Sequence, residues 1–126
     1  MERIHPEGFP PPVVPLSHGV RAGDFVFVSG QIATRPDNDV LIGDFPAEVD
    51  SAIDNLEAVL HGAGAQLSDL VKVNAYLSNA MLFAEFNRIY SRRIGAAPPA
   101  RTTVVVDFGH PDVRVEIEGI AYTGRS

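Results

Sequence analysis

Apolar side chains spaced three and four residues apart mark one long amphipathic helix near the middle of the chain. Asp44 can cap its first turn, Pro46 fits within that turn, and Gly64 is a stop signal. The helix predicted over 45–63 must bury its apolar stripe against another layer of the fold. The stripe consists of Val49, Ile53, Leu56, Leu60 and Ala63, with Asp50, Asp54, Glu57 and His61 on the other side.

The rest of the chain alternates between strand-like and helix-like patterns. A second helix is predicted over 79–94, and Gly95 ends it. The predicted strands are two within 16–34 around a turn at 21–24, one over 71–77, one over 101–107 and one over 113–122, with loops at 35–43 and 109–112. This β-β-α-β-α-β-β order is typical of an α+β fold in which two helices cover one face of a mixed sheet of five or six strands.

The length of the chain leaves the second face of this sheet without a covering layer. The 126 residues suffice for one domain, 1–126, in which residues 1–13 form an extended proline-rich arm. The strand over 25–30 is apolar on both sides, as expected of a strand covered on both faces. Association of identical copies through the second face is the natural way to cover it.

The composition limits which binding partners and which cellular location are expected. The formal net charge is −6, and the densest basic spot, Arg88, Arg92 and Arg93, lies at helical spacing and most simply forms a solvated helix face. A nucleic-acid partner is therefore not expected, because such proteins carry a basic stripe. No apolar run is long enough to cross a membrane, and the N-terminus lacks the apolar region of a secretory signal. A cytoplasmic location is expected.

Several kinds of catalytic site find no support in the residues. There is no cysteine, no glycine-rich phosphate loop and no nucleophile elbow. The histidines are scattered along the chain, without the i, i+3 or i+4 spacing that would favour a shared metal ion. No metal site and no classical nucleophile are therefore predicted.

Arg101 is the first unusual charged residue. It follows the rigid Pro-Pro-Ala at 98–100 and opens an apolar strand, so its guanidinium must either be paired or await an anion. A planar guanidinium matches a carboxylate bidentately. An internal salt bridge is the other interpretation, and the sequence alone leaves both open.

Glu116 and Glu118 are the second unusual feature. Both lie on one side of the last strand, and the alternation by itself is typical of a solvent-facing edge. Ile120 and Tyr122 continue the same side, however, so the glutamates have apolar neighbours. Such surroundings raise the pKa of a carboxyl group, which suits a general base or a group that orients water.

Five segments together resemble the RidA/YjgF family of enamine and imine deaminases. They occur in that family's order and at about its spacing, and the likeness extends from about residue 14 to residue 121. The most specific part is the pair of blocks that contain Arg101 and Glu116. The five segments are FVSGQI at 27–32, DNLEAVL at 54–60, FNRIY at 86–90, PPARTTV at 98–104 and VEIEGIA at 115–121.

The resemblance implies a fold, an assembly and a chemistry. Family members resemble chorismate mutase in fold and form homotrimers with sites in clefts between subunits. By the resemblance, Arg101 binds the substrate carboxylate, Glu116 holds and activates the hydrolytic water, and Ser29, Gly30 and Asn87 line the cleft. The implied reaction is that of a 2-iminobutanoate/2-iminopropanoate deaminase, a hydrolase that converts enamines such as 2-aminoacrylate, through 2-imino acids, to 2-oxo acids and ammonia. No cofactor is required.

Two positions depart from the family pattern and keep other functions open. Leu16 stands where the family often has tyrosine, and Thr103 stands where it often has cysteine. Both changes alter the pocket wall, and Leu16 can make room for a larger acid, as in a pathway-specific member resembling 2-aminomuconate deaminases. One alternative is a non-catalytic trimer that binds small carboxylates or acts like a chaperone. Another is RNA cleavage, against which the acidic composition argues.

Overall fold

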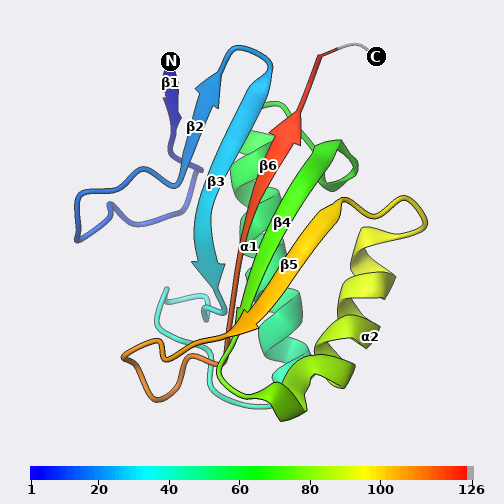
Figure 1. Cartoon of the computed structure of the whole chain (residues 1–126). Helices are drawn as coiled ribbons and strands as arrows, with labels where there is room; N and C mark the ends of the chain where they lie inside the picture. The colour runs from blue at the N-terminus through cyan, green and yellow to red at the C-terminus, as the bar shows by residue number, and fades with distance from the viewer. Residues whose placement is uncertain (125–126) are drawn as a thin grey trace.

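The computed structural model describes residues 1–124 and contains one six-stranded sheet with both helices on one side (Figure 1). The strand order is β1-β2-β3-β6-β4-β5, and every neighbouring pair is antiparallel except β4 with β5. The elements are β1 (Glu2–Ile4), β2 (Gly19–Ala22), β3 (Phe25–Ile32), α1 (Phe45–Gly62), β4 (Leu70–Leu77), α2 (Phe83–Ile94), β5 (Ala100–Val105) and β6 (Val115–Tyr122), with short 3₁₀ turns at Leu67–Asp69 and Ala80–Leu82. The predicted α+β class is confirmed.

Helix α1 has the caps that its sequence indicated. The Asp44 side chain accepts a hydrogen bond from the Ala47 backbone N–H at 2.8 Å, and Gly64 adopts a left-handed φ of 76° just beyond the end. The apolar stripe is buried against β3 and β6. None of the described helices is both long and apolar enough to span a bilayer.

The second helix begins later than predicted. Asn79 caps a 3₁₀ turn by accepting from the Met81 N–H at 2.8 Å, and α2 follows from Phe83. Phe86 and Tyr90 turn inward on one face of α2 and pack against the core. The face that carries Asn87 is thereby directed toward the neighbouring edge strand β5.

The N-terminal arm contains a strand that the sequence pattern did not reveal. Residues Glu2–Ile4 pair antiparallel with β2 and place Ile4 in the core. The pattern was too short to indicate a strand, but the prolines begin only at Pro6, so the backbone donors before it can pair. The observed order is therefore β-β-β-α-β-α-β-β.

The sheet face opposite the helices carries large apolar side chains that no described element covers. Phe25, Phe27 and Val104 remain 42%, 44% and 40% exposed. The expectation that the strand over 25–30 is covered on both faces therefore fails for a single chain. Exposed aromatic side chains of this kind mark an association surface.

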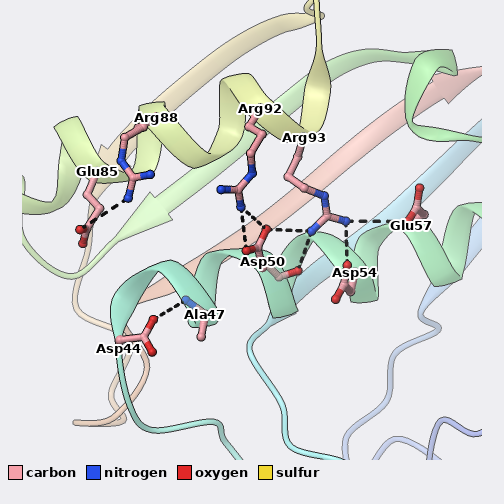
Figure 2. A network of polar contacts seen from close by, with 9 residues as sticks. All are labelled: Asp44, Ala47, Asp50, Asp54, Glu57, Glu85, Arg88, Arg92 and Arg93. Atoms are coloured by element: carbon pink, nitrogen blue, oxygen red, sulfur yellow. Dashed lines mark hydrogen bonds and ion pairs between the residues drawn. The ribbon is translucent and has the colours of Figure 1, made fainter.

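Two arginines of α2, Arg92 and Arg93, pair with acids of α1 (Figure 2), and the expected solvated face holds for Arg88 and Arg92, which are 60% and 57% exposed. Arg92 contacts Asp50 at 2.9 Å, and Arg93 contacts Asp50 at 3.0 Å and Asp54 at 2.7 Å. The Arg93 side chain is only 20% exposed. Arg88 alone keeps a loose and exposed pair, at 3.9 Å from Glu85.

An ion pair between the buried Glu48 and the partly exposed Arg114 joins the start of α1 to the residue before β6. Glu48 is 2% exposed and accepts hydrogen bonds from Nε of Arg114 at 3.0 Å and from its Nη2. The same guanidinium donates to the Gly43 carbonyl at 3.0 Å and lies over the Phe45 ring. Hydrogen bonding to Glu48 raises the pKa of Arg114 above its ordinary value.

Candidate functional site

The seven candidate residues fall into two groups on opposite faces of the sheet. Side chains of paired strand residues share a face, so the register decides which residues lie together. Arg101 and Thr103 pair with the core residues Val73 and Ala75, which places them on the helix side. Glu116 pairs with Tyr76 on the open side.

The first group is built around the Arg101 guanidinium between β5 and α2. Nη2 of Arg101 donates to Oδ1 of Asn87 at 2.7 Å. The guanidinium carbon lies 4.8 Å from the Tyr90 ring centre and 5.4 Å from that of Phe86, so two aromatic faces support the cation. Among residues 1–124, no carboxylate forms an ion pair with Arg101. The internal salt bridge that the sequence left open is therefore not present among these residues.

Thr103 and Tyr90 add polar atoms to this group. Oγ1 of Thr103 and the Tyr90 hydroxyl are buried without a hydrogen-bond partner among the described residues. Burial raises the pKa of Tyr90, and the nearby Arg101 charge opposes that rise. Tyr90 therefore stays a neutral hydrogen-bond donor at physiological pH.

The second group is built around the Glu116 carboxyl on the open face. Burial is the main cause that raises the pKa of Glu116, and the neighbouring Glu118 charge raises it further. Its carboxylate is consequently a stronger base than that of an ordinary surface glutamate. This agrees with the effect expected from its apolar neighbours in the sequence.

Tyr76 and Glu118 form a pair that the sequence analysis did not single out. The Tyr76 hydroxyl donates a hydrogen bond to Oε1 of Glu118, and this bond raises the pKa of Tyr76 to about 12. The Glu118 charge also acts on Glu116, whose pKa it raises. Alternation along 71–77 was the available signal, because it places Tyr76 on the polar side of its strand.

Gly30 lies against the Glu116 carboxyl. A Cβ atom added at Gly30 would lie 2.7 Å from Cδ and 2.8 Å from Oε2 of Glu116. Only a residue without a side chain leaves the carboxyl in its present position. The irregular register between Val28 and Gln31 places Gly30 there.

Replacing Gly30 with alanine tests this contact. The new methyl group must push the Glu116 carboxyl aside, and displacements of about 1 Å at a reacting group cost on the order of 10²-fold in rate. We expect Gly30→Ala to slow any reaction that depends on the Glu116 carboxyl by about that factor, while the thermal melting point stays nearly unchanged. The matched control is Gly43→Ala, since an added Cβ meets nothing within 4 Å there. Equal activity of the two variants would show that the contact has no role.

Ser29 precedes Gly30 and anchors the loop that contains Leu16. The Ser29 hydroxyl donates to the Ser17 carbonyl at 2.6 Å and fixes the loop that follows the arm. Leu16 precedes Ser17 in this loop and is 45% exposed. Ser29 thus holds the loop in place, with Leu16 as an exposed apolar side chain on it.

A single chain does not bring Arg101 and Glu116 together. Their strands are separated by β4, and their positions differ by three residues along the sheet. Ordinary strand spacings put their Cα atoms about 14 Å apart, with side chains on opposite faces. A site that uses both groups must therefore join two copies of the chain.

Comparison with known proteins decides the family. The model of the family described as Endoribonuclease L-PSP matches residues 8–123. The chain belongs to this family, which includes the RidA/YjgF proteins. A RutC family protein of Pyrococcus abyssi is 40% identical over 122 residues, 96% of each chain.

Two further family members resemble the chain along most of its length. The 2-iminobutanoate/2-iminopropanoate deaminase of Dermatophagoides farinae is 37% identical over 112 residues, 88% of each chain. The crystal structure of the YjgF gene product from E. coli superposes with a TM-score of 0.88 at 31% identity, covering 98% of this chain and all of that one. The predicted RidA/YjgF membership is confirmed, and the family contains both deaminase and endoribonuclease names.

Proposed function

We propose that the chain hydrolyses 2-imino acids, and the enamines that tautomerise to them, into 2-oxo acids and ammonia. The active site lies between copies of the chain, with the Arg101 group from one copy and the Glu116 group from the next. The observation that carries this proposal is that the two faces of the sheet hold groups of opposite charge. One face holds a guanidinium with no carboxylate partner among the described residues, and the other holds a carboxyl group of raised pKa.

Arg101 binds the substrate carboxylate. Its Asn87 bond and the two aromatic rings hold the guanidinium plane, and the remaining N–H groups are available for a bidentate contact. Because these neighbours already fix the guanidinium, little side-chain entropy is lost when the anion binds. The anchored carboxylate fixes the position of the adjacent C=N carbon.

Glu116 acts as the general base toward water and as the general acid toward nitrogen. Its carboxylate takes a proton from water as the water oxygen bonds to the C=N carbon, whose π electrons pass to nitrogen. The protonated Glu116 delivers that proton to nitrogen, which gives a carbinolamine. The carboxylate then takes the proton of the new hydroxyl group and passes it to the amino group, so that the C=O bond forms as the C–N bond breaks and ammonia leaves. A raised pKa suits both steps, and such general acid–base assistance gives about 10²–10⁴-fold. The reaction consumes one water molecule and requires no cofactor.

A homotrimer fits the exposed sheet face. The open face carries Phe25, Phe27 and Val104 beside the Glu116 group, so covering these side chains brings a neighbouring chain close to the carboxyl. A closed ring in which each copy gives its helix-side group to the next copy repeats one heterologous contact three times. Each trimer then contains three equivalent sites.

Arg101→Ala tests the anchor. We expect kcat/KM for 2-aminoacrylate, generated in situ, to fall by about 10²–10³-fold, because a desolvated ion pair with the substrate is lost. Ammonia release is the measurement, and the oligomeric state should not change. Arg88→Ala is the matched control, since Arg88 has only a loose exposed pair at 3.9 Å. An Arg101→Ala enzyme as active as the control would contradict the assignment.

Binding without catalysis is a second candidate function. The observation in its favour is that neither Leu16 nor Thr103 supplies the ionisable side chain often found at these family positions. Such a protein would bind small 2-oxo acids at Arg101, as calorimetry would detect, and would hydrolyse none of a panel of imino acids. Wild-type rates above those of buffer decide in favour of the deaminase.

RNA cleavage, the activity in the family model's description, finds less support in the chain. The net charge is −6, and two of the three clustered arginines of α2 are paired with acids of α1. Phosphate backbones are bound by unpaired cations on an exposed surface. We therefore favour the small carboxylate as the anion for Arg101.

A further inference from the structure

The outer edge of β3 borders a cavity that the proposed reaction has not used. Strand β2 pairs with β3 only as far as Val28, although β3 continues to Ile32. The N-terminal arm and the following loop close the space beyond that point. The resulting cavity of about 170 Å³, here called the arm pocket, is lined among others by Phe9, Pro10, His18, Gly30, Ile32 and Asn38.

The arm pocket begins beside the Glu116 carboxyl. Gly30 lines the pocket, and its missing Cβ would point at that carboxyl, 2.7 Å from Cδ. Ile32, which also lines the pocket, is the register partner of Glu116 and shares its face of the sheet. A molecule that reacts at Glu116 can therefore extend past Gly30 toward Phe9.

Two of the three amide side chains that line the pocket, those of Gln31 and Asn55, donate hydrogen bonds within the chain, and Asn38 is the third. Nδ2 of Asn55 donates to the Ile32 carbonyl and to Oγ1 of Thr34, both at 2.9 Å. Nε2 of Gln31 donates to the Ser29 carbonyl at 3.0 Å. The amide nitrogens of Asn55 and Gln31 are thus already used within the chain.

Phe9, Pro10 and His18 form the arm side of the pocket. The Phe9 and His18 rings meet edge to face with centres 4.9 Å apart. Both ring nitrogens of His18 are buried without a hydrogen-bond partner among the described residues, and burial lowers the pKa of His18, so the ring is neutral near pH 7. Phe9 and Pro10 supply the apolar part of this wall.

We propose that the arm pocket binds the side chain of the substrate, and that the preferred substrates are 2-imino acids with an apolar side chain of about four to six carbon atoms. This inference rests on the proposed deaminase function. The volume equals that of about five or six water molecules. A branched aliphatic side chain fits this volume, whereas a methyl group would fill only a small part of it. The exposed apolar Leu16 near Ser29 agrees with such a substrate.

The test compares two imino acids that differ only in the side chain. The imino acids of alanine and leucine are generated in situ by an amino acid oxidase, and ammonia release gives kcat/KM for each. We expect the leucine-derived substrate to be favoured by about 10- to 100-fold, since each buried methylene adds to binding. Calorimetry of the corresponding stable 2-oxo acids runs in parallel, because binding does not depend on turnover.

Phe9→Ala removes one wall of the pocket without touching Arg101 or Glu116. We expect it to reduce the preference for the leucine-derived acid at least tenfold, because the loss falls mainly on the substrate that fills the pocket. Phe108→Ala, at a different cavity, is the matched control and keeps the preference. If Phe9→Ala does not fold, Phe9→Leu serves with a smaller expected loss.

The possible outcomes test the arm pocket and the deaminase reaction independently. Turnover of both substrates with no preference, or a preference that survives Phe9→Ala, overturns the pocket and leaves the deaminase intact. If neither substrate is hydrolysed, the deaminase fails, and calorimetry still decides the pocket. Tighter binding of the leucine-derived oxo acid that is lost in Phe9→Ala then supports the pocket, and equal binding of both oxo acids refutes it.

Discussion

Glu116→Gln should lower kcat for imino acid hydrolysis by about 10²–10⁴-fold, the usual contribution of general acid–base assistance. Glutamine keeps the shape of the side chain but cannot accept the proton of the attacking water. Binding of the 2-oxo acid product should change little, since its carboxylate is bound by Arg101. Ammonia release at saturating substrate gives the rate, and calorimetry gives the affinity.

The stability of the Glu116→Gln variant separates a catalytic loss from a folding defect. The folded protein raises the pKa of Glu116, so this group contributes stability when protonated and loses that contribution as pH rises through the folded pKa. A neutral glutamine avoids the cost of a buried charge. Above neutral pH the variant should therefore melt no lower than the wild type, and a large drop in melting temperature would mean that the activity loss has a structural origin.

The pH profile provides a second readout of the same group. The active form is the carboxylate, so activity is present above the pKa of Glu116 and is lost as pH falls through it. Since the Glu118 charge helps to raise that pKa, Glu118→Gln should move the acid limb of kcat to lower pH. An acid limb that stays in place would show that Glu116 is not the titrating base.

Arg114→Met should destabilise the protein by about 3–5 kcal/mol, because it leaves Glu48 buried and unpaired. For a chain of this size, that corresponds to a fall in melting temperature of roughly 10–20 °C. Thermal unfolding at a fixed protein concentration measures it, since association also stabilises the folded state.

Two controls test the cause of this loss. Arg35→Ala breaks an exposed pair whose side chains are 50% and 56% exposed, and should leave the melting temperature nearly unchanged. The double variant Glu48→Leu, Arg114→Met removes both charges and should recover much of the stability lost in Arg114→Met. If the double variant loses as much stability as the two single variants together, the buried charge of Glu48 is not the cause.

The sequence predicted elements best where one local pattern determines them. The stripe from Val49 to Ala63 and its caps were sufficient for α1, and the alternation from Val113 onward placed Glu116 and Glu118 on one face. Strand β1 was missed, because three residues are too few to show a period, and its pairing with β2 is a long-range contact.

The arrangement of the candidate site depended on register, which local patterns do not determine. Which face Arg101 occupies follows from the parallel pairing of β5 with β4, and the contact of Gly30 with Glu116 follows from an irregularity in β3. The ion pairs of Arg92 and Arg93 likewise depend on how α2 packs against α1 (Figure 2). The resemblance to a family supplied the residues, and the structure shows that they divide between two faces.

The most direct test of the shared site mixes two inactive variants. Arg101→Ala and Glu116→Gln chains, each inactive alone, are refolded together in equal amounts, and ammonia release from 2-aminoacrylate is measured. In a ring of copies, a site is intact when its Arg101 comes from a Glu116→Gln chain and its Glu116 from an Arg101→Ala chain, which random mixing gives for about a quarter of the sites. We predict recovery to about a quarter of wild-type activity. A mixture no more active than either variant alone would contradict a site built from two copies.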